Sequence, residues 1–297
     1  MTAPESIRWC HGRDGIELMQ AALDRHVYDR HIHESYAIGV TLRGVQRFWC
    51  RGAIRDSTPG HVIVINPGET HDGRSGASGG YAYRMFYIPV SVFETVVEEV
   101  PGHPSDFSVP HPLVFDSSLS RQLDAAWRVM ARSPGSLAAD ELFHRALNVL
   151  AARHMEHGPP RPAGSHDRVL NQIRDYLHDR IEQSVTMREL SGIAPLSRFQ
   201  LTRLFQKAYG LPLHAYHLHL RLEEAKRRLR AGQAIAAVAA DLGFVDQSHL
   251  HRRFKAWFGM TPGQWRAAHG YKTPGRARDY SDPDARHPAA RRSVPAI

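Results

Sequence analysis

The hydrophobic pattern of the first third of the chain is typical of short β-strands. Between residues 26 and 90, runs rich in β-branched and aromatic residues are separated by turns that contain glycine and proline. The runs cover residues 36–42, 45–50, 61–65 and 81–88. Short strands at this spacing predict a small β-barrel or sandwich.

From residue 117 to residue 154 the apolar positions follow the period of an α-helix instead. One apolar face runs along each of two segments, and the Ser-Pro-Gly sequence at 133–135 separates them. The faces are made of Leu119, Leu123, Ala126, Trp127 and Met130 in the first segment and Leu142, Phe143, Ala146, Leu147 and Leu150 in the second. We expect two helices, which either pack on the strands or form a dimer seam.

Two helix–turn–helix patterns follow in tandem, over residues 187–210 and 234–259. Residues 213–230 join them as one uninterrupted basic helix, which would be about 25 Å long at the α-helical rise. One helix–turn–helix unit can place one helix in a DNA major groove. Two units on a rigid spacer would hold two such helices about one DNA turn, roughly 34 Å, apart.

Capping signals mark the ends of these predicted helices. Thr186 with Glu189 forms a capping box, and Ser197 begins the second helix of the first unit. Gly210 then provides a left-handed residue after that helix. In the second unit Gly243 supplies the turn and Asp246 the cap. Ala236, Ala239 and Ala240 predict a slim first helix there that a partner can approach closely.

Polar side chains remain on the second helix of each unit once its apolar stripe is turned to the core. They are Arg198, Gln200, Thr202, Arg203 and Gln206 in the first unit and Gln247, Ser248, His249, Arg252 and Arg253 in the second. Arginine pairs with guanine and glutamine with adenine in the major groove, so these residue types suit base reading. The cations of the joining helix, which either contact phosphate or are only solvated, are Arg221, Lys226, Arg227, Arg228 and Arg230.

The positive charge of the chain lies in its C-terminal part. The net charge is +8, and residues 165–270 carry 16 Lys and Arg against 9 Asp and Glu. This distribution indicates that only the C-terminal part meets a polyanion. No stretch of 18 apolar residues predicts a membrane span, and the N-terminus lacks a signal-peptide core.

The two cysteines, Cys10 and Cys50, form no CxxC pair, which argues against a disulfide scaffold or a zinc finger. A cytoplasmic protein is therefore expected. Composition shifts predict an N-terminal domain over residues 1–155, a Pro/Gly linker at 156–166, a helical domain at 167–270 and a disordered tail at 271–297.

The sequence from Val169 to Arg266 resembles the DNA-binding domain of the AraC/XylS family of bacterial transcription regulators. The string GFVDQSHLHRRFKAWFGMTPGQWR, from Gly243 to Arg266, matches nearly every fixed position of the family signature. Arg221-Leu-Glu-Glu-Ala225 and the Leu204-Phe205 pair also match. Pro195 departs from the glycine that is frequent in the first turn, so this turn must close differently, and Leu250 stands where phenylalanine is usual.

The resemblance implies which side chains read bases. They would be Phe199, Thr202 and Arg203 in the first unit and Gln247, Ser248, His249 and Arg252 in the second, and we add the neighbouring Gln200 as a candidate. Core packing is the alternative role for Phe199.

The pattern His31-x-His33, Pro59-Gly60 and Asn66-Pro67-Gly68-Glu69-x-His71 is similar to the cupin-like effector and dimerisation domain of the same family. This implies a β-barrel that holds a small ligand. Three histidines on a barrel could bind Fe, Zn, Ni or Cu. In cupin enzymes, however, the first carboxylate ligand lies several residues beyond the histidines, whereas Glu34 directly follows His33. We therefore expect no metal or other cofactor, and histidines that form hydrogen bonds or contact a ligand.

Alternate residues of a strand face the interior of a barrel, which gives candidates for effector contacts. They are His33, His71, Tyr83 and Met85, with Arg43 and Arg47 as weaker candidates. Nothing in the sequence identifies the effector.

The expected fold is α+β in two domains: a cupin-like barrel followed by two helices, then an all-α tandem helix–turn–helix domain. The expected function is that of an effector-controlled, sequence-specific transcription activator rather than an enzyme. Its expected partners are double-stranded promoter DNA, an effector and a second copy in a homodimer, with RNA polymerase as a further candidate and no membrane.

Three alternatives stay open. One is a metal-dependent cupin enzyme with an appended DNA-binding domain. Another is a DNA binder without a ligand, whose barrel serves only for dimerisation. DNA alkyl repair is the third, and it is disfavoured because it needs an activated cysteine, for which Cys10 and Cys50 show no setting.

Overall fold

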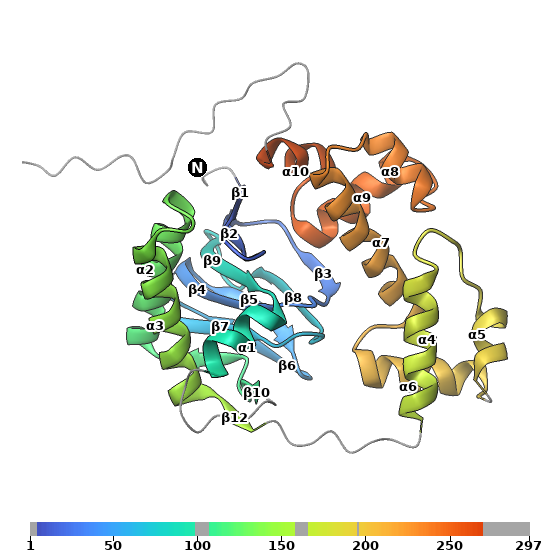
Figure 1. Ribbon diagram of the computed structural model, residues 1–297, viewed down its shortest axis with the longest axis horizontal. Coiled ribbons are helices and arrows are strands. Elements are labelled where there is room, and N and C mark those ends of the chain that lie inside the picture. Colours follow the sequence, from blue (N-terminus) through green and yellow to red (C-terminus); the bar gives the residue numbers. More distant parts are fainter. Residues whose placement is uncertain (1–4, 99–106, 158–165, 195, 270–297) are drawn as a thin grey trace, which may run out of the picture.

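The computed structural model describes residues 5–98, 107–157, 166–194 and 196–269, and its N-terminal domain is built on two antiparallel sheets (Figure 1). The six-stranded sheet has the order β1 (Ser6–His11), β2 (Glu17–Leu23), β9 (Tyr81–Ile88), β4 (Tyr36–Gly44), β7 (His61–Ile65) and β11 (Leu113–Phe115). The four-stranded sheet has the order β3 (Tyr28–His31), β8 (His71–Ser75), β5 (Gln46–Cys50) and β6 (Ala53–Ser57). The four strands expected from the sequence are all present. This cupin-like architecture is the one that the sequence predicts.

The sequence prediction did not include the first two strands. β1 and β2 pair with each other, and β2 also pairs along its whole length with β9. The segment of β2, ELMQAAL, is rich in residues that favour helices, so its strand conformation comes from pairing rather than from local preference.

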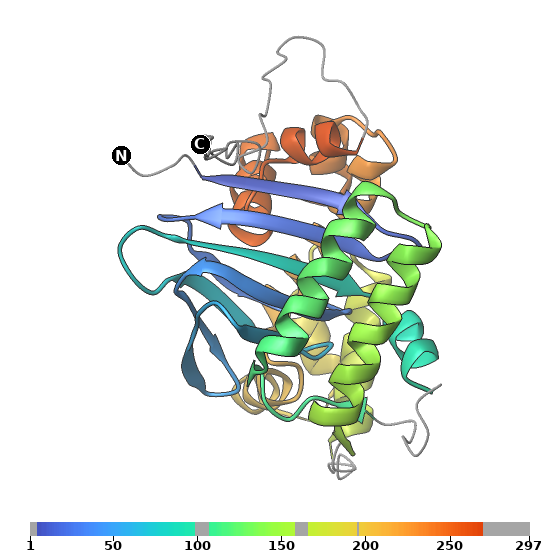
Figure 2. The same cartoon turned by 90° about the vertical axis from the view of Figure 1, so that its left-hand side faces the viewer.

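The two expected helices are α2 (Ser117–Arg132) and α3 (Leu137–His154), and they pack on the outer face of the six-stranded sheet (Figure 2). Asp116 and Ser136 cap their N-termini. The Trp127 indole donates to the Met85 carbonyl of β9 at 3.2 Å, and Arg84 pairs with Asp124 at 2.6 Å. Of the two roles that the sequence left open, packing on the strands is therefore observed. A short helix, α1 (Val90–Glu98), contacts α3.

The C-terminal domain is entirely helical within the described residues. Its elements are α4 (Asp167–Asp179), α5 (Met187–Ile193), α6 (Arg198–Tyr209), α7 (Leu213–Arg230), α8 (Ile235–Asp241), α9 (Gln247–Phe258) and α10 (Pro262–Ala268). The capping box of Thr186 and Glu189, the Ser197 cap and the Asp246 cap all form as predicted. The joining helix α7 has the predicted bounds.

Some local predictions need correction or lie outside the described residues. In α8 the buried residues are Val238 and Ala239, whereas Ala236 and Ala240 are exposed. The predicted linker begins with β12 (Glu156–His157), which pairs with β10 (Phe107–Ser108). Pro195, residues 158–165 and the predicted tail at 271–297 lie outside the described residues.

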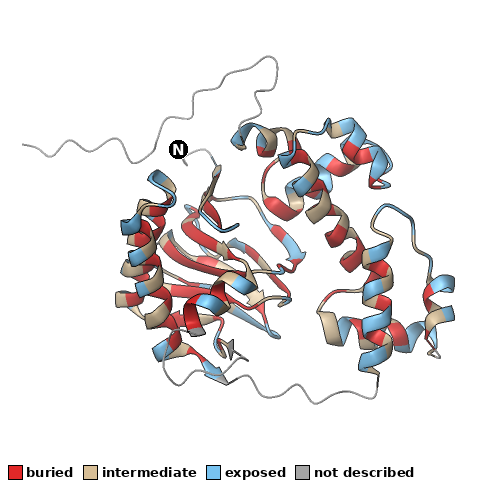
Figure 3. Cartoon of the chain, viewed as in Figure 1, coloured by how far each residue is buried: buried red, intermediate tan, exposed pale blue. Residues whose placement is uncertain are grey.

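The two domains are in direct contact through the second helix–turn–helix unit. α9 packs against β3 and α10 against β1. Trp257 and Phe258 of α9 and Trp265 of α10 are buried, and Figure 3 shows buried residues along α9. Trp9 of β1 makes an edge contact with Trp265 of α10, with ring centroids 5.2 Å apart. Buried Glu17 pairs with Lys226 at 2.5 Å and with Arg230 at 2.9 Å, so the joining helix is also bound to the N-terminal domain.

Candidate functional site

The second helices of the two units, α6 and α9, repeat each other at a spacing of 49 residues. Ser197 and Asp246 cap them at equivalent positions, and Gly210 and Gly259 end them with φ angles of 76° and 74°. Phe205 and Phe254 are both fully buried at the same position of the repeat. Side chains with the same offset from the cap therefore project from matching faces of the two helices.

In α6, the exposed face carries the expected base-reading candidates. Phe199 is 76% exposed, which rules out the core role that the sequence left open for it. Arg203 is exposed, and Thr202 is half-buried with its hydroxyl donating to the Arg198 carbonyl. Gln200 is exposed, but its side-chain oxygen accepts the Ser197 amide at 3.0 Å in a capping box. Gln200 is thus engaged in holding the start of the helix.

In α9, Gln247, Ser248 and Arg252 are exposed. His249 is half-buried; its pKa is lowered by partial desolvation and by the positive charges of Arg253 and Arg252. Its Nδ1 accepts the Val245 amide at 3.4 Å, so the neutral ring carries its hydrogen on Nε2 and presents a donor.

The repeat adds one residue that the sequence analysis missed. His251 is exposed and occupies in α9 the position of Thr202 in α6. The spacing from the two capping residues could have identified it. Leu250, the second departure from the family pattern, is fully buried in the core.

The cations of the recognition helices differ from those of the joining helix in how they are paired. Among the described residues, no ion pair involves Arg203 of α6 or Arg252 of α9. The cations of α7 instead bind within the protein: Lys226 and Arg230 to Glu17, Arg227 and Arg228 to Glu224, and Arg221 to the carbonyls of Ile181 and Gln183. Arg203 and Arg252 are therefore exposed cations of the recognition helices that are available to a polyanion.

The second candidate site is a cavity between the sheets that reaches the DNA-binding domain. All four predicted effector residues, His33, His71, Tyr83 and Met85, line it. The sequence analysis missed that Trp257 and Phe258 of α9 also line it, because the contact joins distant parts of the chain. The weaker candidates do not line it: Arg47 is on the surface and pairs with Asp56 at 2.6 Å.

A wider cavity of about 440 Å³ adjoins the first and lies between the two domains. The two cavities share Trp9, His33, Tyr87 and Phe258. Glu17 from the sheet and Lys226 and Arg230 from α7 also line the wider one. A molecule placed there would contact both domains.

Comparison with known proteins agrees with both halves of this arrangement. A model of the AraC-like ligand binding domain matches residues 15–147, and a helix-turn-helix domain model matches residues 190–268. The chain belongs to the AraC family of transcription regulators. It therefore combines a DNA-binding domain with a ligand-binding domain, as the sequence resemblance implied.

Relatives of this AraC-family protein are named as transcriptional regulators. The chain is 26% identical over 234 residues to the uncharacterized HTH-type transcriptional regulator YbfI of Bacillus subtilis, covering 75% of this chain and 81% of YbfI. It is 25% identical over 193 residues to the HTH-type transcriptional regulator GbdR of Pseudomonas aeruginosa, covering 64% of this chain and 53% of GbdR. The crystal structure of apo ToxT K231A from Vibrio cholerae has the same two-domain fold, with a TM-score of 0.59 at 9% identity, covering 87% of this chain and 99% of ToxT.

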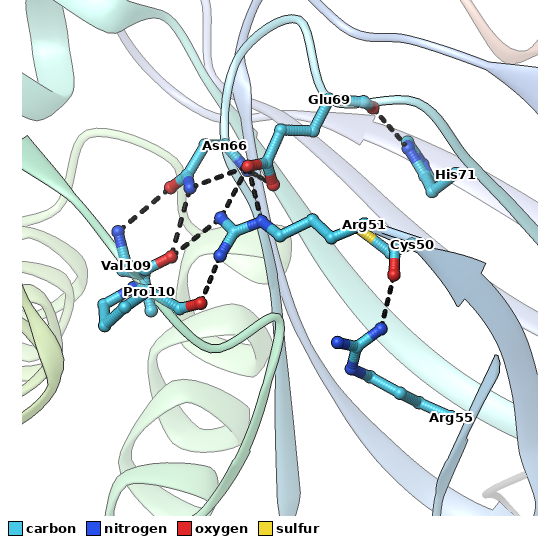
Figure 4. A network of polar contacts seen from close by, with 8 residues as sticks. All are labelled: Cys50, Arg51, Arg55, Asn66, Glu69, His71, Val109 and Pro110. Carbon is cyan, nitrogen blue, oxygen red and sulfur yellow. Dashed lines mark hydrogen bonds and ion pairs between the residues drawn. The ribbon is translucent and has the colours of Figure 1, made fainter. Parts of the chain in front are cut away.

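A polar network in this AraC-family protein fixes the loop that leads to His71 (Figure 4). Arg51 donates to the Glu69 carboxylate and to the Val109 carbonyl, and Asn66 bridges Glu69 and Val109. The Glu69 carbonyl then accepts from Nδ1 of His71 at 3.0 Å. The network therefore sets the orientation of the His71 ring.

The cysteines give no support to the repair alternative. Burial raises the pKa of the Cys50 thiol to about 12, with the Glu69 charge adding to the effect. Such a thiol is the opposite of an activated nucleophile.

No helix in the described part of the chain is both long and apolar enough to cross a bilayer.

Proposed function

We propose that this protein activates transcription from specific promoter sites by placing α6 and α9 in successive major grooves. The observation that carries the proposal is the distribution of unpaired cations. Arg203 and Arg252 are exposed at equivalent positions of the two helices, whereas the cations of α7 are bound to carboxylates or carbonyls of the protein itself. Phosphate contacts would supply most of the affinity and its salt dependence, and the few base-reading side chains the specificity.

The proposed readers lie on the outward faces of the two helices. Arg203 and Arg252 would pair with guanine, and Phe199 would contact thymine methyl groups. The other readers would be Thr202 in the first unit and Gln247, Ser248 and His249 in the second, with His251 added by the repeat. Gln200 would mainly cap α6.

We also propose that a small effector acts at the two adjoining cavities. Their walls combine residues of the sheets, of α7 and of α9, so an effector bound there would alter how the DNA-binding domain sits on the barrel. ToxT, which shares the fold, has been crystallised with an unsaturated fatty acid, so a member of this architecture does take a small ligand.

We propose that the protein also assembles with a second copy of itself and with the transcription machinery. The protein would act in the cytoplasm as a homodimer, with promoter DNA and RNA polymerase as its macromolecular partners. It would need no catalysis, in keeping with relatives that are named as regulators.

Selection of bound fragments from genomic DNA tests the central part. Enrichment of a motif with two half-sites spaced by about one helical turn would support it. Recovery of random fragments in proportion to their abundance would refute it. Repeating the selection with a metabolite library would separate an effector-controlled regulator from one whose barrel serves only for dimerisation.

A further inference from the structure

Three histidines meet at the contact between the barrel and α9. His31 ends β3, His33 follows it, and His71 begins β8, directly opposite His31 in the sheet. One ring nitrogen of each lies within 4.8 Å of the other two. Ring centroids are 4.2 Å apart for His31 and His71, 4.8 Å for His31 and His33 and 5.1 Å for His33 and His71.

Backbone contacts determine which nitrogens are free. Nδ1 of His31 lies 2.6 Å from the Asp29 carbonyl, and Nδ1 of His71 lies 3.0 Å from the Glu69 carbonyl. A carbonyl only accepts, so both Nδ1 atoms carry hydrogen and both Nε2 atoms of the neutral rings keep a lone pair. A hydrogen bond from the second ring nitrogen to a carbonyl is the usual support of a metal-binding histidine.

The third histidine, His33, has a ring nitrogen without a hydrogen-bond partner among the described residues. His33 is 8% exposed, and this nitrogen, Nε2, is buried. Buried polar atoms are nearly always satisfied, so an unpartnered nitrogen within a cluster of three imidazoles points to a ligand.

The size of the space separates a metal ion from an organic ligand. The free volume of the cavity that the histidines line is about 40 Å³. This is enough for an ion with one or two waters, since a single water needs roughly 10–15 Å³ on the same measure. A sugar or an aromatic acid would not fit there unless the domains moved apart.

We propose that His31, His33 and His71 bind one divalent transition-metal ion, for which Zn²⁺ is the probe. Three imidazoles with an open fourth position suit Zn²⁺, and the set contains no carboxylate. The sequence predicts no metal because no carboxylate follows the histidines at the spacing of cupin enzymes. Glu34 is exposed and outside the cluster, so the site is a three-histidine site instead.

The site also lies where the sensing and reading domains meet. The rings of His31 and Trp257 of α9 are 6.0 Å apart, and Trp257 lines the same cavity. A ligand that takes the fourth coordination position of the metal would therefore lie close to Trp257 and could shift the second recognition helix, α9. The metal site itself does not depend on the proposed effector control.

Metal binding to the full chain without an affinity tag tests the inference. The chelator-treated protein is titrated with Zn²⁺ and, in parallel, with Co²⁺, and bound metal is measured after gel filtration. We expect one ion per chain and a visible Co²⁺ spectrum typical of nitrogen ligands in a tetrahedral site. His33→Gln and His71→Gln should each reduce the bound metal at least tenfold.

His61→Gln is the matched control, because His61 is a half-buried histidine of the same domain that bonds to Thr58 outside the cluster. It should keep one ion per chain. Circular dichroism separates loss of metal from loss of fold, and the wild-type Co²⁺ spectrum does not depend on any variant. Substoichiometric metal on the wild-type chain, or equal metal on the wild type and His33→Gln, would overturn the proposal. DNA binding measured on the same samples reports separately on the proposed function.

Discussion

At the scale of single residues, equivalent positions of the two recognition helices have different surroundings. Arg203 and Arg252 match each other and are both exposed. The position of Ala208 in α6 is taken in α9 by Trp257, which is buried against the sensing domain. The two readers are therefore unequal, and the second is the one in contact with the cavity.

Arg252→Ala tests base reading by α9. Because the guanidinium is exposed and without an ion pair among the described residues, its loss should leave folding unchanged. It should weaken binding to the preferred site by about 1–3 kcal/mol and relax sequence choice at one or two base pairs. Arg227→Ala, on a side chain already bound to Glu224 at 2.6 Å, is the control and should change little. Equal weakening of specific and random DNA by Arg252→Ala would exclude the base-reading role.

Phe199→Ala separates a reading role from a structural one. Since Phe199 is 76% exposed, the free energy of unfolding should change by less than about 0.5 kcal/mol, while affinity for the preferred site falls several-fold. Phe205→Ala, at a fully buried position of the same helix, should instead cost about 3–5 kcal/mol in chemical denaturation. A large loss of stability in Phe199→Ala would contradict this assignment.

At the scale of elements, the N-termini of α5, α6 and α9 could be predicted from the local rules of helix capping alone. Thr186, Ser197 and Asp246 each satisfy amides of the first turn of a helix, an interaction between near neighbours in sequence. The strands of the N-terminal domain were predicted where turns and β-branched residues mark them. β2 was not predicted, because its pairing with β9 is a long-range effect that its own residues do not encode.

Gly259→Ala tests an element end that also serves the domain contact. Gly259 has φ of 74°, which costs a non-glycine residue about 1–3 kcal/mol, and a Cβ there would lie 2.3 Å from Ile7 Cδ1 of β1. We expect a lower melting temperature and a loosened domain contact. Gly192→Ala is the control: it lies within α5 with open space around its Cβ, and should stabilise the protein by about 0.5–1 kcal/mol. An equal change of melting temperature in Gly259→Ala and Gly192→Ala would contradict the role given to the left-handed conformation of Gly259.

At the scale of the whole molecule, the sequence predicted two domains but not their contact. The candidates His33, His71, Tyr83 and Met85 all line the cavity, and for Tyr83 and Met85 of β9 the local alternation of a strand is enough to predict an inward-facing side chain. Trp257 and the Glu17–Lys226 pair were not foreseen, since each joins residues from different domains. Pairing across such distances leaves no periodic signal in the chain.

The Glu17 carboxylate gives the domain contact a pH dependence. Burial alone would raise its pKa, but the charge and hydrogen bond of Lys226 and the charge of Arg230 outweigh this and lower it below 4.5. Because the pKa of Glu17 is lower in the folded protein than in the unfolded chain, its ionised carboxylate stabilises the contact at any pH above the unfolded pKa. This stabilisation is lost as the pH falls through the pKa of the folded protein. Glu223, 3.8 Å from Lys226, is half-buried, and desolvation raises its pKa, so its carboxylate gives less support to Lys226 in acid. We expect the contact to hold at neutral pH and to weaken below about pH 4.

Glu17→Gln should therefore open the contact at neutral pH. Removing one partner of a buried pair costs about 3–5 kcal/mol, because the Lys226 charge is left with Glu223 alone. Small-angle scattering should report a larger radius of gyration. Asp56→Asn, which breaks the exposed pair with Arg47, should cost less than about 1 kcal/mol and leave the radius unchanged. An unchanged radius in Glu17→Gln would contradict the role given to this pair.

The central claim is that one chain reads two successive major grooves with α6 and α9. Hydroxyl-radical footprinting on a selected site, with wild-type protein and with Arg203→Ala and Arg252→Ala, tests it most directly. The account predicts two protected segments on one face of the duplex, about 10 base pairs apart, and each variant should weaken protection at a different segment. A single protected segment, or the same segment weakened by both variants, would contradict it.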